Sequence, residues 1–294
     1  MASEVAFKTF LSLVKPLKNK GLGNIRFVNN AYRWAEGMLL PHSSRLVTVN
    51  GLKMQLVAKS IDGIERQLIY NHEYEPVTTS ILKKVVRPGM TSVDVGANIG
   101  YFTLLLSGLV GENGRVWSFE PEEQNFTMLL NNIRLNDLNN IITLQQALSN
   151  KVTTCNLYVS GEESGEHGLI LRRHCKKVQS VTTTTLDRVV TQYVDVVKTD
   201  TEGNDFNVLL GAKRLFGRRP LFVTEFWPDG IMASGTSPKI FWDYLKSMYK
   251  WIYLVDEIEK SISVAVYENA LTRCRRNMMS VNLVCSKEAL NVLE

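Results

Sequence analysis

The sequence predicts an α/β domain built on a mostly parallel β-sheet with helices on both faces. The first observation is that short apolar runs, typical of buried strands, alternate with segments whose apolar residues recur at helical spacing. The second is the segment VDVGANIGYFT (93–103), in which an apolar run ends in an acid and breaks into glycines before a helical pattern begins. Strands that alternate with helices in this way form parallel sheets whose two faces are both covered. No Pro/Gly/Ser-rich linker interrupts the chain, so one main domain is the simplest organisation.

The N-terminal part is predicted to form an extension of this domain. Residues 45–59, RLVTVNGLKMQLVAK, alternate apolar and polar residues around Asn50-Gly51, a pair that favours the tight turn of a β-hairpin. The first twenty residues have the spacing of an amphipathic helix that caps the domain or lies on a membrane or a partner. We therefore predict a helix and hairpin extension over residues 1–80 and the main domain over residues 81–294.

The main domain is predicted to alternate strands with helices. The predicted strands are TSVDVG (91–96), RVWSFEP (115–121), NIITLQQA (140–147), YVDVVKTD (193–200), PLFVTEF (220–226), WIYLVD (251–256) and SVNLVC (280–285). The predicted helices are 100–110, 122–136, 204–216 and 237–248. A more polar section between Ser149 and Thr185 is predicted to add strands in TTCNLYVS (153–160) and VQSVTTTTL (178–186).

The composition indicates an ordinary globular protein of a reducing compartment. Hydrophobic residues make up 45% and charged residues 21% of the 294 residues, and the formal net charge is +5. This mild positive excess is compatible with an anionic partner without requiring one. The cysteines are scattered along the chain, which counts against a zinc site or a disulfide framework. No apolar run approaches the length of a membrane span and no cleavable signal is recognisable, so we expect a cytoplasmic protein.

The segment VDVGANIGYFT is predicted to bind a cofactor. In doubly wound sheets, ligands bind beyond the carboxyl ends of the strands. Gly96 allows a sharp turn there, and Gly100 allows the next helix to lie close to the strand and the ligand. A dinucleotide would prefer a glycine in place of Asn98, and its pyrophosphate would be repelled by Asp94. Asp94 instead suits an ammonium or a sulfonium while the helix N-terminus suits a carboxylate, and S-adenosylmethionine carries all three groups.

An acid after the next strand is predicted to bind the ribose of this cofactor. Glu120 lies 24 residues after Gly96, close to the roughly 20 residues expected for a carboxylate that accepts hydrogen bonds from ribose hydroxyls. The adenine would then lie near the end of the third strand, beside Gln146, Ala147 and Leu148. Because these signals coincide with predicted strand ends, they favour a binding site over a structural turn and a surface acid.

These segments together resemble the FkbM-type S-adenosylmethionine-dependent methyltransferases. The resemblance extends from about residue 45 to residue 285, through YEPVTTSILKKVVRPGMTSVDVGANIGYFT, GRVWSFEPEEQNFTMLLNNIRLN, TTTTLD, VDVVKTDTEGNDFNVLLGA and PLFVTEF. It implies a Rossmann-like class I methyltransferase fold with seven main strands, the last antiparallel, and methyl transfer to hydroxyl groups of sugars or polyketide-type natural products. It assigns residues to a cofactor loop (Asp94, Gly96, Asn98, Gly100), a ribose acid (Glu120) and a D-x-E-G block (Asp200, Glu202, Gly203). Tyr74 and Glu75 resemble a block that closes over the methionine end of the cofactor.

Acids at two later strand ends are predicted to act on the methyl acceptor. In KTDTEGND, Lys198, Asp200 and Glu202 share one face if the strand continues that far, and Glu225 ends the next strand. Clustered carboxylates repel one another, so at least one should have a raised proton affinity, which suits a base near neutrality. We expect Asp200 to face the reacting groups, Glu202 to act as the base or to orient the acceptor, and Glu225 to support them.

Two alternatives apply to the same acids. Asp200, Glu202 and Glu225 could hold a magnesium ion that acidifies the acceptor hydroxyl, but spacing specifies no further ligand, so this interpretation is less favoured. Alternatively, Asp200 caps the helix that begins at NDFNVLLGA while Glu202 is solvated.

Other residues carry weaker signals. His167 could reach over the site from its loop and act as a base, although a lone loop histidine is more often simply exposed. Phe226 and Trp227 follow a strand end, where they either line an acceptor pocket or pack. Basic clusters at 172–177, 213–219 and 273–276 are more often solvated faces, and they would also suit the phosphates of a nucleotide sugar or a lipid-linked glycan.

The sequence therefore predicts an S-adenosylmethionine-dependent O-methyltransferase that acts on a hydroxyl of a sugar, a glycoconjugate or a related natural product, with magnesium not favoured. Three alternatives stay open: an RNA ribose methyltransferase, a cofactor-binding protein without catalysis, and a dehydrogenase. RNA is the less favoured partner because no recognisable RNA-binding module accompanies the basic clusters and stacking aromatics are sparse.

Overall fold

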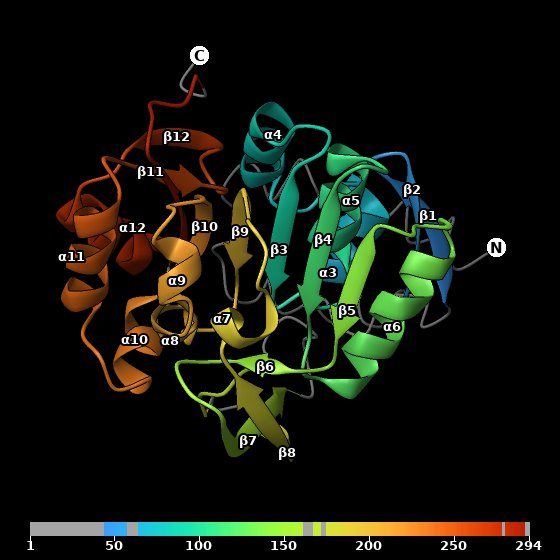
Figure 1. The fold of residues 1–294 in the computed structure, drawn as a ribbon, viewed down its shortest axis with the longest axis horizontal. Helices are drawn as coiled ribbons and strands as arrows, with labels where there is room; N and C mark the ends of the chain where they lie inside the picture. The colour runs from blue at the N-terminus through green and yellow to red at the C-terminus, as the bar shows by residue number, and fades with distance from the viewer. Residues whose placement is uncertain (1–43, 58–63, 161–166, 172–174, 278–279, 292–294) are drawn as a thin grey trace, which may run out of the picture.

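The computed structural model describes residues 44–57, 64–160, 167–171, 175–277 and 280–291. Its centre is an eight-stranded β-sheet in the order β12-β11-β13-β10-β9-β3-β4-β5 (Figure 1). The strands are β3 (Thr91–Val95), β4 (Arg115–Phe119), β5 (Ile141–Leu144), β9 (Val196–Thr199), β10 (Leu221–Phe226), β11 (Trp251–Asp256), β12 (Ser261–Val264) and β13 (Val281–Ser286). The predicted N-terminal helix lies outside the described residues.

The arrangement of the strands confirms the predicted fold class. Strands β10, β9, β3, β4 and β5 are parallel neighbours, and the last strand, β13, runs antiparallel to both β10 and β11. The sheet has one strand more than the seven predicted, because β12 folds back on β11 as an antiparallel edge strand. The sequence of β12 is SISV and most of it is exposed, so it lacks the apolar run that identifies a buried strand.

Helices cover both faces of the sheet. Successive strand side chains point to opposite faces, so that Val196 and Val197 of β9 belong to two different hydrophobic cores. The helices are α3 (Ile64–Asn71), α4 (Pro76–Val85), α5 (Tyr101–Val110), α6 (Glu123–Arg134), α7 (Leu186–Val189), α8 (Asp205–Leu210), α9 (Lys213–Phe216), α10 (Pro228–Ala233), α11 (Pro238–Met248) and α12 (Tyr267–Asn277). Side chains of α7 to α12 enter one core and those of α3, α4 and α5 the other. Among the described helices, none combines the length and the apolar character that a membrane span needs.

The predicted N-terminal hairpin is present. β1 (Arg45–Val49) pairs with β2 (Leu52–Leu56) and leaves Asn50 and Gly51 as the turn. Both turn residues have positive φ, 52° and 79°, as a primed hairpin turn requires. Buried side chains of the hairpin join the same core as α5. The predicted division of the chain at residue 80 falls inside α4.

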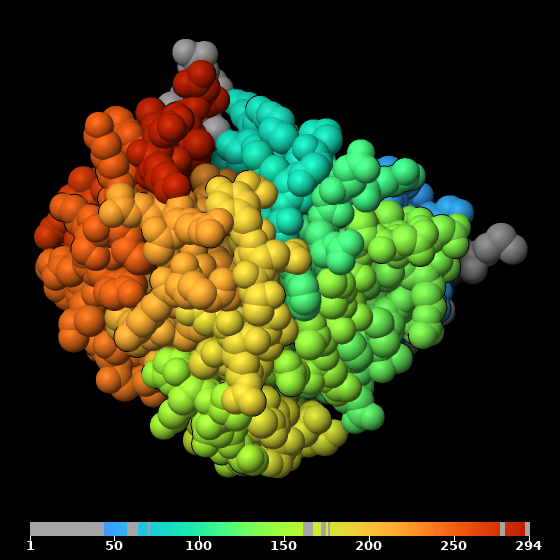
Figure 2. All heavy atoms as spheres, in the orientation of Figure 1, coloured from blue at the N-terminus to red at the C-terminus, as the bar shows by residue number. Residues whose placement is uncertain are grey.

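A small three-stranded sheet lies beyond the carboxyl ends of the main parallel strands and forms one end of the molecule (Figures 1 and 2). It consists of β6 (Ala147–Leu148), β7 (Thr153–Ser160) and β8 (Cys175–Thr184), in the order β6-β8-β7. β7 and β8 confirm the two extra strands expected in the polar section. The predicted third strand, in contrast, is divided: β5 ends at Leu144, and Ala147 and Leu148 pair with β8.

The predicted helix over 204–216 is interrupted by Gly211. A Cβ at Gly211 would lie 2.1 Å from the carbonyl oxygen of Ser149, so the chain approaches the backbone after β6 too closely for any other residue. The result is two short helices, α8 and α9, instead of one. Helix α12 was not predicted, since the residues that it buries, Ala270 and Cys274, are small and give no clear apolar stripe.

Candidate active site

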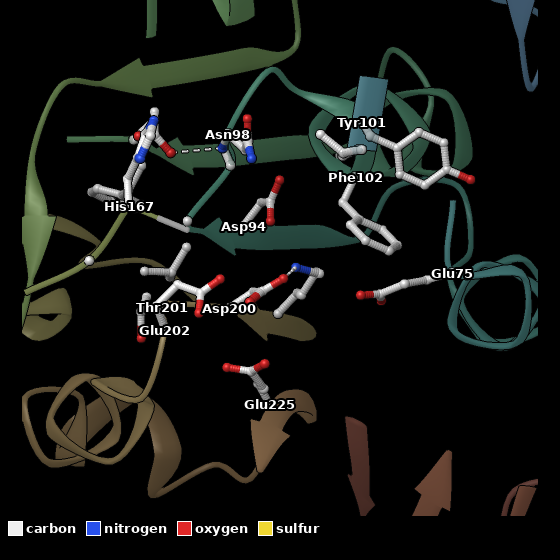
Figure 3. A pocket seen from close by; sticks show the side chains of 18 of the residues that line it. Glu75, Asp94, Asn98, Tyr101, Phe102, His167, Asp200, Thr201, Glu202 and Glu225 are labelled. Carbon is white, nitrogen blue, oxygen red and sulfur yellow. Dashed lines mark hydrogen bonds and ion pairs between the residues drawn. The ribbon is translucent and has the colours of Figure 1, made fainter. Parts of the chain in front are cut away.

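A cavity of about 470 Å³ lies at the carboxyl ends of β3, β4, β9 and β10. Almost all of the residues predicted to bind the cofactor or the acceptor line it: Glu75, Asp94, Gly96, Asn98, Glu120, Gln146, Ala147, Asp200, Glu202 and Glu225. Figure 3 shows Asp94 and Asp200 near the middle of this space, with Glu75 and Glu225 pointing toward it from other sides. Parallel strands end at one edge of the sheet, and this brings together acids that are far apart in the sequence.

The loop after β3 makes a turn for which glycine is essential. Gly96 has φ of 80°, and a Cβ there would lie 1.9 Å from the carbonyl oxygen of Asp200. The N–H groups of Gly96 and Ala97 both donate to the carbonyl oxygen of Phe119, at 2.9 and 3.0 Å. The loop is therefore hydrogen-bonded to the end of β4 and lies in close contact with the residue that follows β9.

Gly100 is the predicted cofactor-loop residue that does not line the cavity. Its φ is 98°, and a Cβ there would lie 2.7 Å from Cδ1 of Leu129 in α6. Gly100 therefore allows α5 to begin close against α6, and the structure does not place it where it was predicted, beside the ligand.

Asp94 is a fully buried acid at the tip of β3. Its Oδ2 accepts a hydrogen bond of 2.6 Å from the hydroxyl of Thr103, while its Oδ1 is buried without a hydrogen-bond partner among the described residues. Burial raises the pKa of Asp94 above its ordinary value, and nearby Lys198 partly opposes this rise. The second oxygen is thus a buried acceptor that still lacks a donor, as expected beside a cationic ligand.

Glu120 follows β4 and is also buried. Its Oε2 accepts from the N–H of Asn98 at 2.7 Å, and its Oε1 from the N–H of Glu122 at 2.9 Å. Burial raises the pKa of Glu120 to about 7, although these two N–H groups lower it. Each carboxylate oxygen can accept a further hydrogen bond, so the side chain is held in place and can still receive two donors from a ligand.

We expect Glu120→Ala to weaken binding of S-adenosylmethionine by roughly 1–3 kcal/mol for each ribose hydroxyl left unpaired. Because its pKa lies near 7, the ionised acceptor is lost as the pH falls below that value, and wild-type affinity should fall with it. Isothermal titration calorimetry at pH 6 and pH 8.5 measures both effects. The control is Glu123→Ala, which removes an exposed acid three positions further on. An unchanged dissociation constant in Glu120→Ala would remove Glu120 from the binding site.

The acids at the ends of β9 and β10 form the other side of the cavity. β9 ends at Thr199, and Thr199 pairs with Thr224 of β10, so Asp200, directly after β9, lies level with Glu225 near the end of β10. Oδ2 of Asp200 lies 3.3 Å from Nζ of Lys198. The prediction that Asp200 and Glu225 come together is thus matched by the geometry (Figure 3).

The strand does not continue to Glu202, so the condition under which Lys198, Asp200 and Glu202 would share one face is not met. Residues after Thr199 form a turn in which Glu202 and Gly203 have φ of 57° and 90°. Glu202 reaches the cavity from this turn and lies against Gly168: a Cβ on Gly168 would lie 2.9 Å from Cβ of Glu202. The alternative in which Asp200 caps the following helix is wrong, because Asn204 occupies the N-cap position of α8.

Glu75 enters the cavity from the N-cap position of α4, with φ of 43°. Its Oε2 accepts a hydrogen bond of 2.8 Å from the side-chain amide of Asn282 in β13. Burial raises the pKa of Glu75 to about 8, although Lys198 lowers it. Beside it, the carboxylate of Glu257 accepts hydrogen bonds from the N–H groups of Val77 and Thr78, which fixes the start of α4.

Asn282 and Glu257 were not predicted from the sequence, and no role was predicted for Lys198. All three line the cavity. A signal was present for Asn282 and Lys198, since each is a polar residue inside a strand that is otherwise mostly apolar, at a position where a buried side chain needs a partner.

The remaining predicted residues divide between the cavity and the core. His167 lines the cavity, and its Nδ1 accepts a hydrogen bond of 3.1 Å from the N–H of Ser160. Tyr74 also lines it and packs edge-on against Tyr101 at 5.8 Å between ring centres. Phe226, in contrast, is fully buried in the core, and Trp227 packs over Gly230. Phe226 and Trp227 are therefore packing residues and not walls of an acceptor pocket.

Within the described part of the chain, no group of three or more His, Cys, Asp or Glu side chains is arranged to hold a metal ion. The basic segments 213–219 and 273–276 do not line the cavity. In the third basic segment, the side chains of residues 172–174 and 176 lie outside the described part of the structure.

The sheet order, the glycine loop after the first parallel strand and the acid after the second are those expected of an S-adenosylmethionine-dependent methyltransferase with a Rossmann-like fold. Residues 94–262, more than half of the chain, match the family model described as "Methyltransferase FkbM domain". The chain belongs to the FkbM methyltransferase family. The dehydrogenase alternative is therefore wrong.

Several solved structures are similar to this chain at low sequence identity. The FkbM methyltransferase from Methylobacillus flagellatus is 17% identical with a TM-score of 0.43, and the match covers 67% of this chain and 43% of that one. An rRNA methylase from Streptococcus thermophilus is 11% identical with a TM-score of 0.39, covering 71% and 93%. TYW2 from M. jannaschii, in complex with AdoMet, is 15% identical with a TM-score of 0.44, covering 83% and 86%. This chain thus spans less than half of the first structure, and no curated protein matches it.

Proposed function

We propose that this methyltransferase transfers the methyl group to a hydroxyl of a sugar, a glycoconjugate or a related natural product. The observation that carries the proposal is a single cavity that joins two sets of acids. Asp94 and Glu120 lie at the tips of β3 and β4. Asp200 and Glu225 lie at the tips of β9 and β10, with Glu202 in the turn beside them. One set suits a cationic cofactor and the other an acceptor hydroxyl that must lose its proton.

The Asp94 side of the cavity fits S-adenosylmethionine. The buried Oδ1 of Asp94 lacks a donor among the described residues, and each oxygen of Glu120 keeps the capacity to accept one ribose hydroxyl. Gln146 and Ala147 lie where β6 begins and would flank the adenine. When bound, S-adenosylmethionine supplies an electrophilic methyl group on a positively charged sulfur.

The opposite side would hold and deprotonate the acceptor. Methyl transfer is an in-line displacement, so the protein must align the acceptor oxygen with the methyl group and exclude water. We assign Asp200 to face the reacting groups, Glu202 to take the proton or to orient the acceptor, and Glu225 to support both. A base placed in this way contributes roughly 10²–10⁴-fold to the rate.

The charges favour a sugar hydroxyl over an RNA ribose. Among the described residues that line the cavity, Lys198 is the one lysine or arginine. The acids are Glu75, Asp94, Glu120, Asp200, Glu202, Glu225 and Glu257. A ribose 2′-hydroxyl in RNA has phosphates close by, and these would meet like charges where water screens little. A phosphate more distant from the reacting hydroxyl, as in a nucleotide sugar, avoids this repulsion.

The test is incubation with methyl-labelled S-adenosylmethionine and separated glycan, lipid and RNA fractions. We expect the label in glycans or glycolipids, on oxygen, and we expect Asp200→Asn to prevent it under the same conditions. Label in the RNA fraction would overturn the proposed acceptor. No label in any fraction, despite measured cofactor binding, would favour the non-catalytic alternative.

The same assay tests magnesium. Since the described residues do not form a metal site, we expect a chelator to leave the transfer rate unchanged. Loss of activity with the chelator, restored by added magnesium, would instead support the interpretation in which Asp200, Glu202 and Glu225 hold the ion.

A further inference from the structure

Lys198 is a buried lysine at the centre of the cavity that the function described so far does not use. Its side chain is 4% exposed, although a lysine is rarely buried unless its charge is paired. It lies on β9, directly beside Asp94 of β3 in the parallel register. Asp200 follows two positions later, so Lys198 stands between the acid assigned to the cofactor and the acid assigned to the acceptor.

The contacts of Lys198 hold its ammonium group in place. Nζ donates a hydrogen bond of 3.3 Å to Oδ2 of Asp200. The same atom lies 4.4 Å from the centre of the Phe102 ring, a distance at which an aromatic face attracts a cation. The Phe102 ring and the Asp200 carboxylate together restrict where the ammonium group can lie. The ammonium group in turn restricts the Asp200 carboxylate.

The charge of Lys198 persists in this environment. Burial lowers its pKa, but Asp200, Asp94 and Glu75 raise it, and the net shift is upward. A lysine whose pKa is raised stays protonated throughout the neutral range. It therefore supplies a fixed positive charge among groups that would otherwise repel one another.

We propose that Lys198 is a positioning residue that holds the carboxylate of Asp200 toward the reacting groups. This inference rests on the proposed function, in which Asp200 faces the cofactor and the acceptor. Lys198 acts through Asp200 and need not touch either substrate.

The effect of Lys198 on Asp200 must be judged against every charged group nearby. These groups come from β3, from the two residues before α4, from the turn after β9, from α8 and from β10. They are Asp94, Glu75, Tyr74, Glu202, Asp205 and Glu225. All of them are acids or a phenol, so none replaces the positive charge if Lys198 is removed.

The experiment compares K198M, which keeps the length of the side chain without its charge, with K198R, which keeps the charge. Without the ammonium group, the Asp200 carboxylate loses the hydrogen bond that holds it, and a misplacement of about 1 Å near a reacting centre can lower the rate by roughly 10²-fold. We expect K198M to lower kcat by up to about 10²-fold with little change in the KM for the acceptor. K198R can still donate to Asp200, so it should recover much of the lost rate. K239M is the control, because Lys239 pairs with Asp243 on an exposed helix surface.

A second comparison separates positioning from general support of the fold. If Lys198 acts through Asp200, adding K198M to D200N should lower kcat no further than D200N alone. No loss of kcat in K198M, an equal loss in K198R, or full multiplication of the two losses in the double variant would overturn the proposal. Should K198M not fold, K198Q is the second variant: its shorter side chain places the donor farther from Asp200, so kcat should again fall.

A structural comparison that needs no acceptor separates this proposal from the proposed function. Crystal structures of the wild type, K198M and K239M with S-adenosylhomocysteine show the direction of the Asp200 carboxylate. The carboxylate should turn away from its wild-type position in K198M and not in K239M, and an unmoved carboxylate in K198M would overturn the role of Lys198. A displaced carboxylate together with no methyl transfer to any glycan would leave Lys198 as the residue that positions Asp200 and would reject the acceptor proposed above.

Discussion

Replacing Asp200 by asparagine should lower kcat for methyl transfer by roughly 10²–10³-fold and change the affinity for S-adenosylmethionine little. Asparagine keeps the size of the side chain but loses the charge that faces the reacting groups. Asp200 lies on the acceptor side of the cavity and is 27% exposed, whereas Asp94 and Glu120 on the cofactor side are buried. Transfer of label at saturating cofactor, together with calorimetric titration, measures the two quantities separately.

The matched control for this substitution is Asp195→Asn at the opposite end of the same segment. Asp195 accepts a hydrogen bond of 2.8 Å from the N–H of Thr91, far from the cavity, so kcat should not change. In Asp200→Asn, Lys198 loses one countercharge but keeps Asp94 and Glu75 nearby. We therefore expect a loss of stability below the roughly 3–5 kcal/mol typical of a broken buried pair. Equal losses of cofactor binding and turnover would show that Asp200 is structural and not part of the reaction.

Replacing Gly96 by alanine should abolish cofactor binding and destabilise the protein by on the order of 3–5 kcal/mol. Two costs add. An alanine at φ of 80° is strained, and its Cβ would lie 1.9 Å from the carbonyl oxygen of Asp200. Because the obstacle is backbone, the loop or the end of β9 must move, and either movement displaces residues that line the cavity. Thermal unfolding and cofactor titration measure the two consequences.

The variant Gly89→Ala separates the effect of left-handed backbone strain from the effect of a steric clash at Cβ. Gly89 has φ of 85°, almost that of Gly96, but a Cβ there would meet nothing within 4 Å. This variant should lose only the roughly 1–2 kcal/mol of left-handed strain and bind the cofactor normally. If Gly96→Ala lowered stability and cofactor affinity no more than Gly89→Ala, the close approach between the loop and β9 would not be needed for cofactor binding.

The cavity concentrates backbone conformations that the rest of the chain mostly avoids. Glu75, Asn98 and Glu202 line it and are not glycines, yet their φ values are 43°, 51° and 57°. Such conformations cost free energy and persist where the surrounding structure enforces them, which is common at binding and catalytic sites. Here each one directs a polar side chain or an N–H group toward the cavity.

Local patterns were sufficient for the fold class and for most of the site. The apolar runs of β3, β4, β9 and β10 identify buried strands, and in a parallel sheet the residues after them must meet at one edge. This is why Asp94, Glu120, Asp200 and Glu225 could be placed in one cavity from their offsets to strand ends alone. The same reasoning did not find β12 or α12, whose burial depends on neighbours and not on their own apolar content.

Long-range packing set the features that no local pattern contains. The contact between Asn282 and Glu75 joins residues 207 positions apart. The direction of Glu202 depends on a left-handed turn that packs against Gly168, whose backbone bridges to Tyr158 of β7. Gly100 was predicted to lie beside the ligand, but it allows the close approach of Leu129 in α6. A glycine motif in the sequence does not reveal which neighbour approaches the glycine. Distances between strands and loops exist only after the chain has folded. These distances decide which side chains share the cavity and which acids lie close enough for Lys198 to balance their charges.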